Sequence, residues 1–182
     1  MPEAQTLTTP QEIEPHLTTE ALHSLRRIVE KTAGTPRPIL KIGMQSGFTS
    51  SWITRVLTHL NDIRLLIGIM PPDEEDPGRP ERVETHFRRR GAWGRVAILH
   101  LEPLVAFRCL SSFSIAVLSS RTLSRVDIDR TLDHLQLVAS QGSLIWAHRT
   151  SREMDQALRD RSWKRWSLSE STQGSHIIYC RK

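Results

Sequence analysis

Short apolar runs alternate with helix-length amphipathic segments along most of this chain. Five runs are almost continuously apolar and are bounded by polar residues, glycine or proline: residues 38–43, 63–69, 95–100, 113–118 and 143–147. Runs of this length are typical of strands buried on both faces, as in a parallel sheet. Helices are expected between them at residues 49–60, 79–90, 103–110 and 125–140, the last ended by Gln141–Gly142. The alternation predicts right-handed βαβ units in a doubly wound sheet.

The two ends of the chain add further elements. Residues 18–33 place apolar side chains at helical spacing, with Thr18 or Thr19 as N-cap and Gly34 as terminator. Beyond residue 150 we expect a helix (151–161), a strand (163–168), a turn (171–174) and a final strand (176–180). Two strands joined by so short a turn must pair antiparallel. The prediction is an α/β, Rossmann-like, seven-stranded sheet, mostly parallel with an antiparallel last strand and with helices on both faces.

Length and composition limit the class of protein. A chain of 182 residues fits one domain, and we expect residues 18–182 to form it after a flexible lead at 1–17. No apolar run approaches the ~18–20 residues of a membrane-spanning helix, and the acidic, polar start does not resemble a secretory signal. Cys109 and Cys180 lie far apart in sequence, which argues against a disulfide framework. These features favour a cytoplasmic protein without membrane contact.

The segment at residues 43–50 leaves the first strand and opens a helix. Gly43 and Gly47 let the backbone turn tightly and approach a ligand, and Thr49, Ser50 and Ser51 offer N-cap groups. A strand-to-helix turn beside a reversal of strand order is the usual ligand crevice of an open α/β sheet. A pair of glycines at such a turn is also common without any ligand.

The phrase IleLeuLysIleGlyMetGlnSerGlyPheThrSer at 39–50 resembles motif I of class I S-adenosylmethionine-dependent methyltransferases, in particular their small O-methyltransferase-like branch. The later strands follow in family order, so the resemblance covers about residues 18–182. It implies S-adenosylmethionine as cofactor. The positions that match cofactor-binding residues of the family are Lys41, Gly43, Gln45, Gly47, Thr49, Met70 and Glu102.

Several of these positions depart from the family pattern. Lys41 stands where the family has an acidic residue that helps to hold the amino group of the cofactor's methionine. Met70 takes the place of the carboxylate that binds the ribose hydroxyls, and Asp73 and Glu74 follow only in the next loop. Glu102 is a fair match for the acidic residue that reads the adenine amine. The departures predict weak binding of the cofactor.

The expected ends of the fourth and fifth strands bear on catalysis. Ser119 and Ser120 stand where the metal-dependent branch has an aspartate ligand, so a magnesium or calcium site of that kind is not expected. His100 and His148 end the third and fifth strands, where ligands bind, and either imidazole could act as a general base. We favour His148. A histidine at a strand end can instead cap a backbone group.

Two basic segments suggest a different kind of partner. Residues 159–166 interleave arginine, lysine and tryptophan, and residues 86–90 read HisPheArgArgArg. Such interleaving is typical of surfaces that bind single-stranded nucleic acid, and we expect weak, non-specific affinity. A solvated helix end with Trp163 or Trp166 packed on the core would give the same pattern.

The sequence thus leaves two functions open. The first is an S-adenosylmethionine-dependent methyltransferase that acts on a small-molecule acceptor without a metal. The alternative is a non-catalytic methyltransferase-like module with a degenerate cofactor site and a basic Arg/Trp surface for a partner. Fold alone cannot choose between them. The acceptor and the oligomeric state are not indicated by the sequence.

Overall fold

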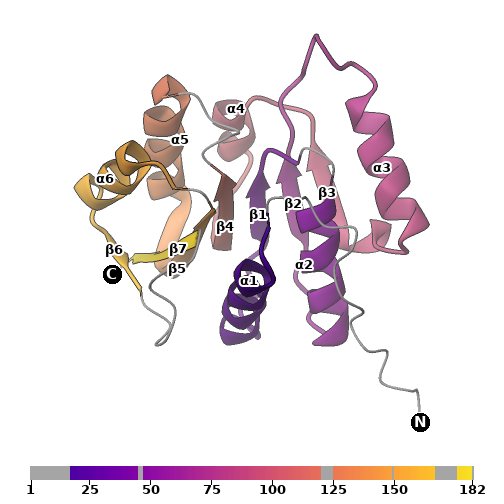
Figure 1. Cartoon of the computed structure of the whole chain (residues 1–182), viewed down its shortest axis with the longest axis horizontal. Helices are drawn as coiled ribbons and strands as arrows, with labels where there is room; N and C mark the ends of the chain where they lie inside the picture. Colours follow the sequence, from indigo (N-terminus) through magenta and orange to yellow (C-terminus); the bar gives the residue numbers. More distant parts are fainter. Residues whose placement is uncertain (1–16, 45–46, 120–124, 149, 167–175, 182) are drawn as a thin grey trace.

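A single mixed sheet organises the computed structural model of the chain, which describes residues 17–44, 47–119, 125–148, 150–166 and 176–181. The strand order is β3-β2-β1-β4-β5-β7-β6 (Figure 1). The strands are β1 (Ile39–Ile42), β2 (Leu66–Ile69), β3 (Val96–Leu99), β4 (Phe113–Ser119), β5 (Ala139–His148), β6 (Trp163–Arg165) and β7 (His176–Arg181). Strands β1 to β5 pair in parallel, and β7 pairs antiparallel with both β5 and β6. The predicted seven-stranded, mostly parallel α/β sheet is confirmed.

The helices lie close to their predicted positions. They are α1 (Thr19–Lys31), α2 (Phe48–His59), α3 (Arg79–Arg89), α4 (Pro103–Arg108), α5 (Arg125–Val138) and α6 (Arg152–Asp160), with a 3-10 turn, η1 (Trp93–Arg95), before β3. Thr18 caps α1, and its side chain accepts a hydrogen bond from the Ala21 amide. None of the described helices is long and apolar enough to cross a membrane. The Cys109 and Cys180 thiols are free.

Two apolar layers cover the sheet. One layer contains buried side chains of α1, α2 and α3 and the other those of α4, α5 and α6, as the helices on the two faces show in Figure 1. Successive residues of β1 alternate between them: Ile39 packs in the first layer, and Leu40 and Ile42 pack in the second. Lys41 therefore faces the same layer as Ile39.

The boundary between α5 and β5 differs from the prediction. The helix expected to run to residue 140 and to end at Gln141–Gly142 stops at Val138, and β5 begins at Ala139. The Ser143 hydroxyl donates a hydrogen bond to the Phe113 carbonyl oxygen over 2.7 Å, which fixes this segment on β4. The register between β4 and β5 shifts at this point. Tertiary hydrogen bonds thus draw the last two residues of the expected helix and its expected Gln141–Gly142 terminator into the sheet.

A buried ion pair lies just before the amino end of β2. Arg64 is 2% exposed and donates a hydrogen bond to Asp62 over 2.7 Å. Arg64 Nη1 donates hydrogen bonds to Thr32 Oγ1 (2.7 Å) and to Ser114 Oγ (3.1 Å). Arg64 Nη2 also donates to the Val29 carbonyl oxygen (2.8 Å). Burial opposes ionisation of Asp62, but the hydrogen bonds and charge of Arg64 outweigh it and lower the pKa of Asp62. One side chain therefore joins α1, β2 and β4.

Candidate functional site

The carboxyl ends of the parallel strands carry most of the predicted site residues. Gly43 follows β1, Met70 follows β2, His100 follows β3, and His148 ends β5. Because β1 to β5 run in parallel, these positions meet at one edge of the sheet. Gln45 and Ser120 lie outside the described residues. Ser119 ends β4 and is opposite His148 in the register.

The turn between β1 and α2 depends on two glycines in the left-handed backbone region. Gly43 has φ +73° and Gly47 has φ +82°. The Gly47 amide donates to the Met44 carbonyl oxygen over 2.7 Å, and Gly47 is the N-cap residue of α2 without a capping side chain. The expectation that residues 49–51 supply the N-cap groups is wrong. A side chain at Gly47 would be strained, since L-residues rarely adopt this φ.

The first turn of α2 is buried. Thr49, Ser50 and Ser51 are 3%, 0% and 4% exposed. Among the residues that the structure describes, the hydroxyls of Ser50 and Ser51 have no hydrogen-bond partner. Most buried side-chain polar atoms in proteins are hydrogen-bonded, so two such hydroxyls in one helical turn are unusual. They mark this turn as a place where a polar ligand group could be received.

Lys41 is 5% exposed and lies in the middle of the sheet. Its neighbours in the register are Gly68 on β2 and Val117 on β4. Its Nζ donates to the carbonyl oxygen of Ile42, the last residue of β1, over 3.5 Å. The ammonium group therefore lies near the carboxyl end of β1, beside the glycine turn.

The ribose position lacks the expected polar group. Met70 is 1% exposed and packs in the layer under α1 to α3. Asp73, the first of the four carboxylates in the following loop, is held by Arg79 at the start of α3, with Oδ2 2.9 Å from Nη1. Its Oδ1 also accepts from the Glu75 amide over 3.1 Å. Asp73 is therefore already paired close to its own loop. The thioether of Met70 is only a weak hydrogen-bond acceptor, so it cannot replace the carboxylate expected at this position.

A second methionine fills the space beside β2. Met44 is 1% exposed, and a Cβ added at Gly68 would lie 1.8 Å from its Sδ. No side chain at residue 68 fits while Met44 keeps this position. The absence of a side chain at Gly68 therefore lets Met44 pack under the glycine turn.

The residues that follow β3 are exposed. Glu102 is the N-cap residue of α4, and its side chain makes no capping hydrogen bond. His100 Nε2 lies 3.8 Å from Glu84 Oε1 on α3. Glu102 is thus exposed just after β3, whereas His100 faces an acidic neighbour on α3.

His148 lies in an aromatic stack on the α1 side of the sheet. It is 6% exposed, and its ring lies 5.8 Å from that of Trp146 at an interplanar angle of 6°. His176 is opposite His148 in the register and also stacks on Trp146 at 5.8 Å. Burial lowers the pKa of His176, and the charge of Glu20 partly opposes this. His176 is a residue that the sequence analysis did not single out, because its strand partner was unknown.

No described group of three histidine, cysteine, aspartate or glutamate side chains could hold a metal ion. This finding covers only the described ranges, which exclude Ser120 and residue 149.

The Arg/Trp segment at 159–166 is largely tied into the fold. Trp163 is 2% exposed, and Trp166 lies half-buried with Lys31 Nζ 4.2 Å from its ring centre. Arg159 and Arg165 both form ion pairs with Asp155 on α6. Buried or covered rings cannot stack on bases, and paired guanidinium groups are already partly neutralised. Weak nucleic-acid binding stays a prediction, with less support from this segment than its sequence suggests.

Asp155 is the centre of that network and gives a testable pH dependence. Burial would raise its pKa, but hydrogen bonds from Arg159, Tyr179 (2.6 Å) and Arg165 (2.9 Å) outweigh burial and lower the pKa to about 2. A depressed carboxyl pKa stabilises the fold above the unfolded value of 3.8, and this contribution is lost as pH falls toward 2.

Asp155→Asn should therefore lower the free energy of unfolding by about 2 kcal/mol at pH 7, with the difference shrinking between pH 4 and pH 2. Urea unfolding across this pH range measures it. Asp160→Asn, on the same helix but exposed, is the matched control and should change stability little. If the free energy of unfolding of Asp155→Asn stays below that of the natural protein by the same amount down to pH 2, the lowered pKa of Asp155 is contradicted.

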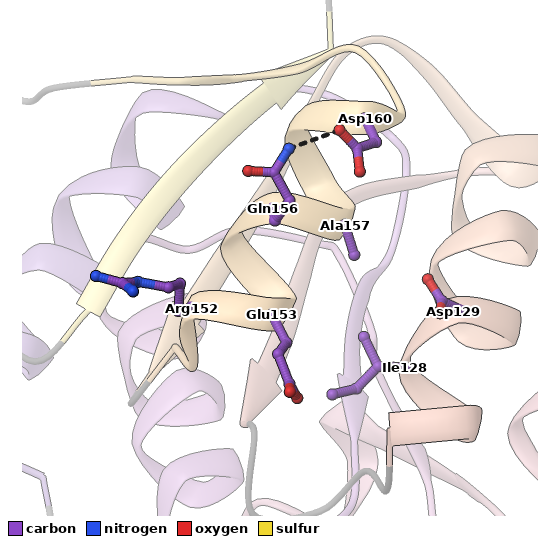
Figure 2. Close-up of a pocket in the computed structure, with 7 residues that line it drawn as sticks. All are labelled: Ile128, Asp129, Arg152, Glu153, Gln156, Ala157 and Asp160. Atoms are coloured by element: carbon purple, nitrogen blue, oxygen red, sulfur yellow. Dashed lines mark hydrogen bonds between the residues drawn. The ribbon is translucent and has the colours of Figure 1, made fainter.

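A cavity of about 380 Å³ lies between α5 and α6 (Figure 2). Its lining is mostly polar: Ile128, Asp129, Arg152, Glu153, Gln156, Ala157 and Asp160. Asp129 pairs with Arg161 over 3.0 Å. Gln156 donates to Asp160 over 2.7 Å, which is the dashed line in Figure 2. None of the sequence-predicted site residues lines this cavity.

Comparisons with known proteins show the fold. No family model and no curated protein matches the chain. A methyltransferase from Geobacter sulfurreducens is similar in structure, with a TM-score of 0.68, 15% identity, and coverage of 92% of this chain and 80% of that one. An O-methyltransferase from Bacillus cereus, solved in complex with SAH (S-adenosylhomocysteine), gives a TM-score of 0.66 at 13% identity, covering 93% of this chain and 84% of that one.

The O-methyltransferase TomG from Streptomyces achromogenes, involved in tomaymycin synthesis and solved in complex with SAM (S-adenosylmethionine), gives a TM-score of 0.64 at 14% identity, covering 90% of this chain and 79% of that one. The chain therefore has the fold of class I SAM-dependent methyltransferases. At these identities the comparison does not extend to substrate or activity.

Proposed function

We propose that this chain binds SAM at the carboxyl edge of its sheet and transfers the methyl group to a small-molecule acceptor without a metal ion. The observation that carries the proposal is the pair of glycines between β1 and α2. Gly43 and Gly47 both adopt positive φ angles, and Gly47 directly precedes the first residue of α2. The strand order and the SAM and SAH complexes of similar structures support it.

The residues of the edge fit part of such a cofactor. Glu102 could accept a hydrogen bond from the adenine amine, and the buried first turn of α2 could receive polar atoms of the methionine tail. Met70 does not fit the ribose hydroxyls, and Lys41 does not fit an ammonium group. When bound, the cofactor would supply an electrophilic methyl group. We therefore expect binding that is specific but weak.

His148 is the residue that would take a proton from the acceptor. It ends β5 at the same edge as Gly43, and imidazole is the side chain that acts most often as a general base in enzymes. Stacking on Trp146 holds its ring in one plane. The chain's contribution to the reaction would be alignment of the acceptor and removal of its proton.

The test is calorimetric titration with SAH. We expect a dissociation constant in the range of tens to hundreds of micromolar, and saturating ligand at ~100 times this value should stabilise the fold by roughly 2.7 kcal/mol. Gly47→Val is the matched variant, since it distorts the turn without changing charge. Absence of any binding or stabilisation at millimolar SAH would overturn the proposal.

Methyl transfer should be independent of divalent metal ions, because the metal-binding aspartate of the related branch is replaced by Ser119 and Ser120. The measurement is release of SAH from SAM in the presence of a panel of phenols, thiols and carboxylic acids, with and without EDTA. Equal rates are expected. Activity that EDTA abolishes and magnesium restores would contradict this prediction.

A second function is favoured by the absence of a carboxylate at Met70 and by the pairing of Asp73 with Arg79. In it, the chain is a non-catalytic module whose crevice takes a different ligand and whose basic residues contact a partner. Arg89, which is exposed at the end of α3, is a candidate contact for an anionic partner. Binding of single-stranded nucleic acid should then be weak and should fall steeply with salt, because each neutralised phosphate releases counterions. Submicromolar binding of one sequence at physiological salt would contradict this expectation and favour a nucleic-acid substrate.

A further inference from the structure

The second apolar layer does not extend over the β2–β3 side of the sheet. Its helices α4, α5 and α6 lie on the β4 side of β2 in Figure 1, and α4, which follows β3, packs against α5. Helix α4 has only six residues, Pro103–Arg108, so it is about 9 Å long and too short to cover β1, β2 and β3 together. The face of β2 and β3 opposite α2 therefore has none of the described helices over it.

The side chains of β2 on this uncovered face are apolar. Leu66 packs in the first layer and Ile67 borders the second, so Leu65 lies on the same face as Ile67. Leu65 continues the strand, because its carbonyl oxygen accepts a hydrogen bond from the Ile39 amide over 3.0 Å. Leu65 is 46% exposed, and Ile63, two residues earlier, is 85% exposed. Two large apolar side chains thus stay in contact with water here.

The neighbouring strand extends this apolar surface. Ile67 pairs with Ala97 and Ile69 with Leu99 in the parallel register, so their side chains lie side by side on one face. Ala97 and Leu99 are half-buried, and Leu101, just beyond β3, is 36% exposed. We call this surface the β2–β3 face, and its residues are Ile63, Leu65, Ile67, Ala97, Leu99 and Leu101. Exposed apolar surfaces that are contiguous in this way mark interaction sites on soluble proteins.

The two ends of the β2–β3 face carry opposite charges. At the amino ends of the strands, Arg95 directly precedes β3 and is half-exposed, and it donates a hydrogen bond to the Asp62 carbonyl oxygen. At the carboxyl ends, the loop after β2 holds Glu74 and Glu75, which are both exposed. Within the described part of the chain neither glutamate forms an ion pair, whereas Asp73 of the same loop is paired with α3. The face therefore has a basic end and an acidic end.

We propose that two copies of this chain form a dimer through the β2–β3 face, with the β2 strands of the two copies antiparallel. A twofold axis places the same surface of both copies face to face, so the surface must be complementary to itself. In the antiparallel arrangement Arg95 of each copy lies near Glu74 and Glu75 of the other. A parallel arrangement brings like charges together, which opposes association. The charges at the two ends thus favour a second copy of the chain as the occupant of this face.

The size of the β2–β3 face sets the expected strength of the dimer. At about 3.3 Å per residue, the stretch from Ile63 to Ile69 is roughly 20 Å long, and two adjacent strands are about 10 Å wide. Stable interfaces bury about 800 Å² on each partner, and this face is at the small end of that class. We therefore expect a reversible dimer with a dissociation constant in the micromolar to tens of micromolar range.

Sedimentation velocity of the full chain over a concentration series measures this association. The mass should rise from that of the 20.8 kDa chain toward twice that value as the concentration passes from micromolar to hundreds of micromolar. A chain that stays monomeric over this range would overturn the proposal.

Two variants assign the dimer to the β2–β3 face. Leu65→Glu places a charge in the centre of the apolar surface and should weaken the dimer at least tenfold. Ile63→Gln is milder, at a more exposed position, and should weaken it at least threefold even if Leu65→Glu fails to fold. Leu137→Glu is the matched control, because Leu137 is 79% exposed on α5, and it should leave the dissociation constant of the dimer unchanged. A dimer that keeps its dissociation constant in Ile63→Gln uses another surface and contradicts the proposal.

Charge reversal tests the antiparallel arrangement. Glu74→Arg/Glu75→Arg places like charges opposite Arg95 of the other copy and should weaken the dimer at least fivefold. Glu81→Arg, at an exposed position on α3, is the control and should have little effect. An unchanged dissociation constant in the double variant would contradict the antiparallel arrangement. SAH should bind Leu65→Glu and the natural protein equally, so the dimer and the proposed function are tested separately.

Discussion

Replacing His148 with glutamine should lower kcat by about 10²- to 10⁴-fold, the contribution of a positioned general base. Glutamine keeps a polar side chain of similar reach, but it cannot take a proton from the acceptor. The effect should fall on kcat, with the dissociation constant of SAH unchanged, because His148 is not assigned to the cofactor. The measurement is SAH release under saturating acceptor, together with calorimetric titration of the variant.

His176→Gln is the control for this experiment. His176 is opposite His148 in the β5–β7 register and stacks on the same tryptophan at the same 5.8 Å, so its replacement disturbs the stack in a similar way. We expect it to retain most of the activity. Equal losses of kcat in the two variants would show that the aromatic stack matters and that His148 is not a general base. Full activity of His148→Gln would show that His148 has no part in the reaction.

Loss of the Arg64 side chain should be the most destabilising single change in the fold. Arg64→Met leaves Asp62 buried without its guanidinium partner, and breaking a buried pair in this way costs about 3–5 kcal/mol. It also removes the bonds to Thr32, Ser114 and the Val29 carbonyl group. Urea unfolding at neutral pH measures the change.

The exposed pair on α1 is the matched comparison for Arg64. Arg26→Met breaks the contact with Glu30 four residues away, and such surface pairs contribute roughly 0.3–0.5 kcal/mol. Removing both partners in Arg64→Met/Asp62→Leu should recover part of the loss, because no unpaired charge then stays buried. An Arg64→Met protein within about 1 kcal/mol of the natural one would refute the importance of this pair.

Much of the candidate site was accessible from the chain alone. The apolar runs predict the strands, and because parallel strands end at one edge, Gly43, Met70 and His148 could be assigned to that edge before any coordinates. The sequence also predicts a tight backbone turn at Gly43 and Gly47, because glycine readily adopts conformations that other residues avoid. The positive φ angles of both residues agree with that expectation. The end of α5 could not be predicted, because Ser143 and its partner Phe113 are distant in sequence.

Charge pairing was also beyond sequence reasoning. The Arg/Trp segment reads as an open basic surface, yet Trp163 is in the core and Arg159 and Arg165 share Asp155. Likewise, Asp73 is available as a ribose ligand by its position in the chain, and only the fold shows that Arg79 holds it. An ion pair depends on where side chains meet in space, which composition does not record.

The sequence by itself determined the α/β class, the number of strands and the turn at which a ligand would bind, because periodicity and glycine conformation act between residues close in the chain. Only the tertiary structure decided where these polar groups lie and which ion pairs form. It places the Lys41 ammonium group at the end of β1, stacks His148 and His176 on one ring, and buries the hydroxyls of Ser50 and Ser51 beside the turn. These arrangements arise from packing between elements, and packing is set by contacts between residues that are far apart in sequence.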